Sequence, residues 1–219
     1  MALVRRTILI LVLIVAAGLV MAAYAAVDRF ELALQGKVFS FPDDHASHPS
    51  FQTEWWYYTG HLESKQGRRF GYELTFFRRR TDSDKLTTNP SRWSAQHLHM
   101  AHFAVTDEAA GTFRFAEKIN RPGLGIAGAD ERRYHVWNED WLAERLGRVF
   151  QLKANMDGYA INLVLSADKP PVIHGLPGEG VHRKRPGKGN ASHYYSLTRL
   201  RTEGFIFVNG EPIEVSGLT

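Results

Sequence analysis

The chain has 219 residues, of which 44% are hydrophobic and 23% are charged, and its formal net charge is +4 at pH 7. This composition is normal for a globular protein and provides for one sizeable core, while so small a positive charge gives no case for a nucleic-acid partner. The chain contains no cysteine, which excludes disulfides, a lipid-modified N-terminal cysteine, thiol catalysis and cysteine metal sites.

The first residues have the features of a targeting element. Arg5 and Arg6 precede an uninterrupted apolar run at residues 8–26. The charged start and the small residues at 23–25 fit a signal peptide, whereas the length of the run fits an uncleaved membrane-anchor helix. Both alternatives leave the two arginines in the cytoplasm. We therefore expect a signal peptide or anchor at residues 1–26 and an extracytoplasmic domain after it.

Two strand-like runs rich in aromatic residues come next, at residues 54–62 and 69–78. Trp, Tyr, Phe and Thr favour strands because flat and branched side chains pack well on a pleated surface. The polar connection at 63–69 contains Gly67, so the two runs predict an antiparallel hairpin. Both faces of this hairpin carry bulky side chains. Such a sheet lies between two layers or curls round something apolar.

Short strands are also expected along the rest of the chain. The candidates are residues 96–107, 111–116, 134–137, 148–156, 159–166 and 192–200. Residues 204–215 predict a hairpin that turns at Asn209-Gly210, because this dipeptide between apolar runs is a strong hairpin signal. Only residues 140–146 indicate a helical turn. Many short strands with little helix predict an all-β fold, an antiparallel sandwich or barrel.

Three histidines lie within six residues, at His97, His99 and His102. Alternation places His97 and His99 on one face of a strand, a spacing that can bind zinc or iron. The segment also resembles the metallo-β-lactamase signature, but Ala101 stands where that signature has Asp, and a strand rather than a helix follows. We therefore expect hydrogen-bonding strand histidines and no metal.

A carboxyl group stands at the start of the first aromatic run. On alternation, Glu54 shares a face with Trp56 and Tyr58. A carboxyl group among aromatic rings loses hydration, so its pKa should rise, and Glu54 is therefore a candidate catalytic proton donor. The alternative is a structural acid bonded to a backbone amide or to an arginine of residues 78–80. The candidate ligand-binding residues are Trp56, Tyr58, Tyr72, Phe76 and His99.

The segment 175–191 is rich in glycine and arginine. It resembles a phosphate-binding loop only at Gly187-Lys188, and the Ser or Thr that should follow is absent. We interpret it as a solvated loop, with a basic lid that touches anionic lipid as the alternative. Ser192 and Ser196 lack a G-x-S-x-G motif, so this region gives little support for a serine hydrolase.

Five sequence blocks together resemble one protein family. They are FPDDHASHPSFQTEWWYYTGHL, GRRFGYELTFFR, HMAHFAVTD, VIHGLPGEG and GNASHYYSLTRL, in this order. From about Gly36 to its end, the chain resembles the AttH / carotenoid 1,2-hydratase (CrtC) family. The resemblance implies an N-terminal lipocalin-like domain, which we place at 37–219 after a linker at 27–36. Complete members continue into a Trp-Met-Asp-x-Glu-Trp block and a second lipocalin-like domain, both of which we expect to be missing here.

The resemblance also implies a function. Family members are extracytoplasmic or membrane-associated, and the carotenoid branch adds water to acyclic carotenoids without a metal or redox cofactor. We therefore predict a protein that binds an apolar lipid or isoprenoid ligand near a membrane surface, with hydratase or hydrolase activity in the complete protein and no cofactor. The alternative is a non-catalytic carrier that works beside a membrane transporter such as an ABC transporter. A metal-dependent hydrolase built on His97 and His99 is the third hypothesis.

Overall fold

The computed structural model describes residues 30–81, 97–176 and 179–219. Most of them belong to one compact unit, Leu32–Thr219, while the second unit is Met1–Glu31. Within the described ranges, no helix is both long enough and apolar enough to cross a membrane. The predicted signal peptide or anchor lies outside these ranges.

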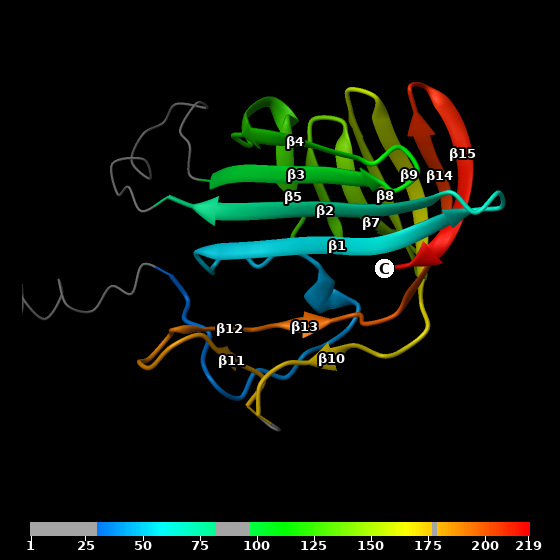
Figure 1. The fold of residues 1–219 in the computed structure, drawn as a ribbon. Helices are drawn as coiled ribbons and strands as arrows, with labels where there is room; N and C mark the ends of the chain where they lie inside the picture. Colours follow the sequence, from blue (N-terminus) through cyan, green and yellow to red (C-terminus); the bar gives the residue numbers. More distant parts are fainter. Residues whose placement is uncertain (1–29, 82–96, 177–178) are drawn as a thin grey trace, which may run out of the picture. The chain divides into compact units, whose positions relative to one another are not determined.

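The unit Leu32–Thr219 is built on an antiparallel sheet of 11 strands, which curls into a nearly closed barrel (Figure 1). The strand order is β4-β3-β2-β1-β15-β14-β9-β8-β7-β6-β5. The predicted all-β fold is thus confirmed. The strands of the sheet are β1 (Thr53–Ser64), β2 (Arg69–Arg80), β3 (His97–Asp107), β4 (Thr112–Asn120), β5 (Ala127–Ala129), β6 (His135–Asn138), β7 (Trp141–Leu146), β8 (Val149–Met156), β9 (Tyr159–Ala167), β14 (Leu200–Val208) and β15 (Glu211–Leu218).

Both predicted hairpins are present. β1 pairs with β2 along nearly its whole length, from Thr53 opposite Arg79 to Glu63 opposite Arg69. β14 and β15 are joined at Asn209 and Gly210, which have φ values of 52° and 88°. Asn and Gly tolerate positive φ, so this dipeptide forms the tight turn that two paired strands require.

Three of the other local predictions were wrong. The segment that indicated a helical turn is strand β7, because Trp141 and Ala143 alternate into the core and burial decides the conformation. Strand β4 extends to Asn120, beyond the expected end at residue 116. The stretch 192–200 forms short separate strands instead of one, and β14 begins only at Leu200.

The core fills the barrel interior. Along β1 the even-numbered residues point inward, and along β3 the odd-numbered ones do. Fully buried side chains from β2, β3, β7, β8 and β9 meet there, among them Leu74, Phe103, Trp141, Leu152 and Leu163. The burial of these large apolar groups is the main stabilising term for a domain without disulfides.

The sheet bends sharply where β15 crosses β1. Only His61–Ser64 of β1 pair with β15, and Gly217 of β15 approaches His61 closely. A Cβ atom on Gly217 would lie 1.9 Å from the backbone oxygen of His61, so the close crossing requires glycine.

The first two thirds of β1, from Thr53 to Gly60, have no partner from β15. Next to it lie the lead-in segment with the short 3-10 helix η1 (Asp43–His45) and two small antiparallel sheets (Figure 1). These sheets pair β10 (Val172–Ile173) with β13 (Tyr195–Ser196), and β11 (His182–Arg183) with β12 (Ala191–Ser192). The side chains discussed below gather where these segments meet β1.

Candidate functional site

The predicted ligand-binding aromatic residues line the barrel interior. Tyr58, Tyr72 and Phe76 are buried members of the main hydrophobic core. Trp56 is half-buried, packs against this core, and donates a hydrogen bond from Nε1 to the backbone oxygen of His45 at 3.2 Å. The predicted common face of Glu54, Trp56 and Tyr58 is therefore real, and its inner part is packed by protein side chains.

Glu54 lies in a dense set of hydrogen bonds. Ser47 Oγ donates to its carboxylate at 2.8 Å, and the backbone N–H of His48 donates at 3.0 Å. Arg78 stands opposite Glu54 in the β1–β2 register, and its Nε lies 3.3 Å from the carboxylate. Arg78 is itself buried and also donates to the backbone oxygens of His48 and Phe51.

These contacts reverse the predicted protonation of Glu54. Burial raises the pKa of this carboxyl, but the hydrogen bonds from His48 and the charge of Arg78 outweigh it, so the pKa is lowered. The predicted rise in pKa was wrong, because the prediction rested only on the aromatic residues next to Glu54 in the sequence. The structural alternative, a bond to a backbone amide and to an arginine of residues 78–80, describes the contacts found. A catalytic role of Glu54 stays a prediction.

His48 lies between two carboxylates. Its Nδ1 is 2.9 Å from Glu54 Oε1, and its Nε2 is 3.1 Å from Asp44 Oδ1. The hydrogen bond to Glu54 is the largest cause that raises the pKa of His48. Lys37 in turn approaches Asp44 to 2.6 Å. We call Asp44, His48, Glu54 and Arg78 the carboxylate network.

A second cluster is centred on His45, which precedes His48 by three residues in the chain. We call it the His45 cluster: Phe39, Phe41, His45, Tyr134, Phe150 and Tyr195. The imidazole of His45 lies 4.8 Å from the Phe41 ring and 5.4 Å from the Phe150 ring, between ring centroids. Its Nδ1 shares a hydrogen bond of 2.7 Å with the Tyr195 hydroxyl. The cluster reaches from half-buried Phe41 to buried Phe150.

The His45 cluster is uncharged at neutral pH. Burial lowers the pKa of His45 to about 4, and the positive charge of Arg145 acts in the same direction. Burial also raises the pKa of Tyr134 and Tyr195 above the ordinary value. The Tyr134 hydroxyl is hydrogen-bonded to that of Tyr58, whose pKa is raised as well. Apolar rings with a few neutral hydrogen-bonding groups among them are typical of a small-molecule site.

The histidines of β3 lie as alternation predicts. His97 and His99 face inward, and their ring centroids are 6.4 Å apart, whereas His102 faces outward toward Glu117. Burial, followed by the neighbouring His97 and Arg78, lowers the pKa of His99 to about 4. As expected of hydrogen-bonding histidines, His97 Nδ1 lies 3.4 Å from Arg78 Nη1 and His102 Nε2 lies 3.5 Å from Glu117 Oε1, whereas His99 Nδ1 is buried and has no partner among the described residues. Among the residues that the structure describes, no group of three or more His, Cys, Asp or Glu could hold a metal ion.

Most residues of the two clusters were not predicted from the sequence. His48, Tyr134 and Tyr195 come from three separate segments, and only folding brings them to β1. One local signal exists, since Asp44, His45 and His48 crowd into the ten residues before the first strand. Titratable residues so dense in a loop next to aromatic strands are a functional hint.

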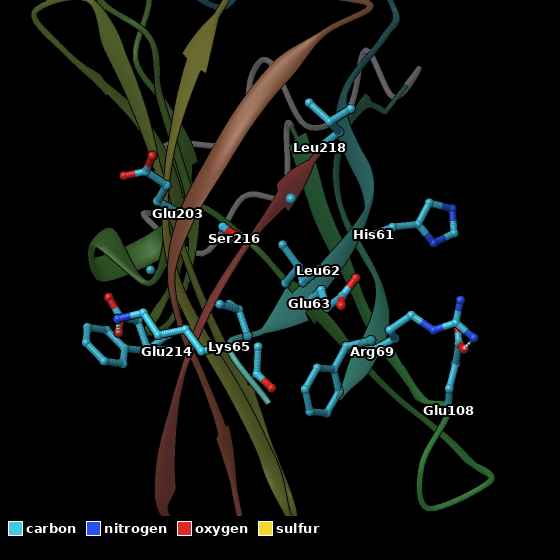
Figure 2. Close-up of a pocket in the computed structure, with 16 residues that line it drawn as sticks. His61, Leu62, Glu63, Lys65, Arg69, Glu108, Glu203, Glu214, Ser216 and Leu218 are labelled. Atoms are coloured by element: carbon cyan, nitrogen blue, oxygen red, sulfur yellow. Dashed lines mark hydrogen bonds and ion pairs between the residues drawn. The ribbon is translucent and has the colours of Figure 1, made fainter. Parts of the chain in front are cut away.

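A separate groove of about 880 Å³ lies at the crossing of β1 and β15 (Figure 2). Figure 2 shows Arg69 and Glu108 on one side of it and Glu214 on the other. Arg69 pairs with Glu108 at 2.6 Å, and Lys65 pairs with Glu214 at 2.5 Å. The groove includes none of the predicted site residues.

Comparisons with known proteins agree with this fold. A sequence model of the AttH-like family matches residues 32–219. The structure is similar to that of an AttH protein from Nitrosomonas europaea, with a TM-score of 0.75 and 30% identity over 86% of this chain and 56% of that one. It is also similar to kievitone hydratase from Nectria haematococca, with a TM-score of 0.57 and 11% identity over 85% of this chain and 53% of that one.

The second likeness concerns the fold alone, because the identity is low. Both likenesses confirm the predicted lipocalin-like fold. The chain spans about half the length of the two proteins. A search among curated proteins found no match.

Proposed function

This chain belongs to the AttH-like family, and from that premise we propose that it is an extracytoplasmic lipocalin-like protein that binds an apolar lipid or isoprenoid ligand. The observation that carries the proposal is the His45 cluster. Its aromatic rings run from the half-buried Phe41 to the buried Phe150, and its imidazole and phenol groups are neutral. A neutral aromatic site lets an apolar ligand bind without the desolvation of a charged group.

The neutral pair His45–Tyr195 would orient the ligand. An imidazole and a hydroxyl can each accept or donate one hydrogen bond, so they would fix a single polar atom, such as an isoprenoid alcohol, against the rings. Aromatic faces stabilise the rest of such a ligand by dispersion and apolar burial. The Trp56 indole, bonded to the backbone of His45, is an internal reporter of binding.

Hydratase chemistry is proposed only for the longer proteins of this family, whereas hydrolase chemistry is proposed for this chain as well. Addition of water to a double bond needs a proton donor, and an ionised Glu54 does not supply one. Among the two clusters, His48 is the group whose raised pKa favours a protonated state near neutrality. In the hydratase form of the proposal, His48 therefore replaces Glu54 as the donor.

A second candidate function is a non-catalytic carrier that delivers the ligand to a membrane transporter, with the membrane surface as a further partner. The tight pairing of Glu54 with Arg78 favours this candidate, since it gives the carboxylate a structural role. In a longer protein of the family, glutamine in place of the residue equivalent to His48 separates the two candidates. The carrier keeps its ligand and shows no turnover in either form, whereas an enzyme loses turnover and keeps the ligand.

Binding is tested with farnesol as the probe and tryptophan fluorescence as the readout. We expect saturable quenching for the wild type and at least a tenfold weaker affinity for Phe41→Ala, because that ring contacts both His45 and Tyr195. Phe113→Ala is the matched control, since Phe113 is 58% exposed on β4 and should leave the affinity unchanged. Equal affinity of the Phe41→Ala variant and the wild type would contradict the proposed site.

A further inference from the structure

The small sheets beside β1 bring a serine and a histidine together. Val172 of β10 pairs with Ser196 of β13, and the backbone N–H of His174 donates to the backbone oxygen of Tyr194 at 2.9 Å. His174 therefore stands opposite Tyr194, and alternation puts Ser196 on the same face as a diagonal neighbour. His174 Nε2 and Ser196 Oγ are 2.8 Å apart.

The His174 ring is held in place from the side. It stacks on Tyr194 with 4.3 Å between centroids and 13° between planes. The Tyr194 hydroxyl is fixed by the Tyr57 hydroxyl on β1 at 2.9 Å, and the Trp55 ring lies 6.0 Å from the Tyr194 ring. A base oriented by a third group, within hydrogen-bond reach of a hydroxyl, has the arrangement that activates a serine nucleophile.

We propose that Ser196 is a nucleophile, that His174 is its general base, and that the pair cleaves carboxylic esters. Both side chains are half-buried, so a substrate can reach them from solvent. In the tautomer that carries its proton on Nδ1, His174 Nε2 accepts a hydrogen bond from the Ser196 hydroxyl, as this role requires. The proposal names the residues behind the hydrolase form of the proposed function and rests on that form.

The reaction has two balanced steps. Ser196 Oγ forms a bond to the ester carbonyl carbon while its proton passes to His174 Nε2, and the ester C–O bond breaks as the alcohol leaves with that proton. Water then attacks the acyl-serine, gives one proton to His174, and releases the carboxylic acid. The proton on His174 returns to Ser196 Oγ. No oxidant, metal or cofactor enters the balance.

The surroundings indicate the class of ester. Lys184 Nζ lies 5.6 Å from the Tyr194 ring centroid and 3.1 Å from His182 Nδ1. The neighbouring exposed residues Arg185 and Lys188 add positive charge along the same loop. These cations favour an amphiphile whose ester group lies near an anionic group.

The site is separate from the His45 cluster although the two share one strand. Tyr195 points toward His45, whereas Tyr194 and Ser196, its neighbours in sequence, share the opposite face. Ligand binding and ester cleavage therefore use different side chains, and one can fail without the other.

The test uses the purified chain and a fluorophosphonate probe, which phosphonylates activated serines. We expect the probe mass on the peptide that contains Ser196 in the folded wild type, and none there after denaturation. His174→Gln should slow labelling at least tenfold, because the base is lost. Ser192→Ala is the matched control, since Ser192 lies in the same segment on β12 and should not change labelling.

Two results would overturn the proposal: an unlabelled Ser196 in the folded wild type, or equally fast labelling of His174→Gln. Farnesol binding is measured on the same samples. Intact binding without labelling refutes only the serine site, and labelling without binding refutes only the ligand site. The wild-type labelling result decides the matter even if a variant does not fold.

Discussion

His45 and His48 are three residues apart, and their pKa values are shifted in opposite directions. His45 is surrounded by aromatic rings, which leave it without hydration and lower its pKa to about 4. His48 is held between Asp44 and Glu54, which raise its pKa. An imidazole that loses hydration among aromatic rings favours its neutral form, whereas an imidazole between two carboxylates favours its charged form.

We therefore assign a structural role to the carboxylate network and propose a ligand-binding role for the His45 cluster. The carboxylate network fixes the lead-in segment to β1 and β2 through ion pairs and backbone contacts. In the proposed function, the His45 cluster is the neutral aromatic site that binds the ligand. Variants in the first should therefore change stability, and variants in the second should change affinity.

The largest effect is expected for Arg78→Met. This change leaves the Glu54 carboxylate buried without its cation and removes two hydrogen bonds to backbone oxygens. We expect the free energy of unfolding to fall by about 3–5 kcal/mol, as for other broken buried pairs, measured by urea denaturation. Arg79→Met on the exposed face of β2 is the control, with a change within about 0.5 kcal/mol. Similar losses in both variants would contradict a structural network.

Glu54→Gln should have a smaller effect. The amide keeps the shape of the carboxylate and part of its hydrogen bonds, but Arg78 and His48 lose a charged partner. We expect a loss of about 2 kcal/mol, within the range for hydrogen bonds to charged groups, and unchanged farnesol affinity. Glu63→Gln, exposed on the same strand, should have little effect. A stable Glu54→Gln variant with weakened binding would move Glu54 into the ligand site.

The pH dependence of stability should differ between the two histidines. The folded pKa of His45 is lowered, so its contribution is complete above its ordinary value of 6.5 and is lost as the pH falls to about 4. The folded pKa of His48 is raised, so its contribution is complete below 6.5 and is lost as the pH rises through the folded value. Urea midpoints measured from pH 4 to pH 9 test both signs.

Glutamine variants show which histidine causes the loss of stability at acid pH and which causes the loss at alkaline pH. His45→Gln should make the urea midpoint less dependent on pH between 6.5 and 4. His48→Gln should make it less dependent on pH on the alkaline side. The depressed pKa values of Asp44 and Glu54 add a further loss of stability at lower pH, as the pH falls through their folded values. If His48→Gln flattened the acid side instead, the assignment of its partners would be wrong.

The smallest effect on stability is expected for Tyr195→Phe. The change removes one hydroxyl, bonded to His45 at 2.7 Å, and keeps the ring. We expect a loss of about 1 kcal/mol, the typical net value of one hydrogen bond, measured by thermal unfolding. Affinity for farnesol should fall more than affinity for the hydrocarbon farnesene, because only the alcohol uses the hydroxyl. An equal fall for both probes would show that Tyr195 contributes only through packing.

Local patterns predicted the parts of the fold that depend on neighbours in sequence. Alternation placed Glu54 beside Trp56 and Tyr58 correctly, and Asn209-Gly210 marked its hairpin. Burial by distant strands was not visible in these patterns, which is why Trp141–Leu146 was expected to be helical.

The candidate site was only partly predictable for the same reason. The pKa of Glu54 depends on Arg78, which lies opposite it only because of the β1–β2 register, and on His48 from the loop before β1. Tyr195 approaches His45 from 150 residues away in the chain. No spacing rule connects such segments, so the His45 cluster became visible only in the folded chain.

The central claim, that the His45 cluster is an apolar-ligand site, is tested most directly by nuclear Overhauser contacts between bound farnesol and the protein. The account predicts contacts from the isoprenoid chain to the rings of Phe41 and His45, and from the alcohol end to Tyr195. Contacts confined to the groove at the β1–β15 crossing, or no contact with these three residues, would contradict it.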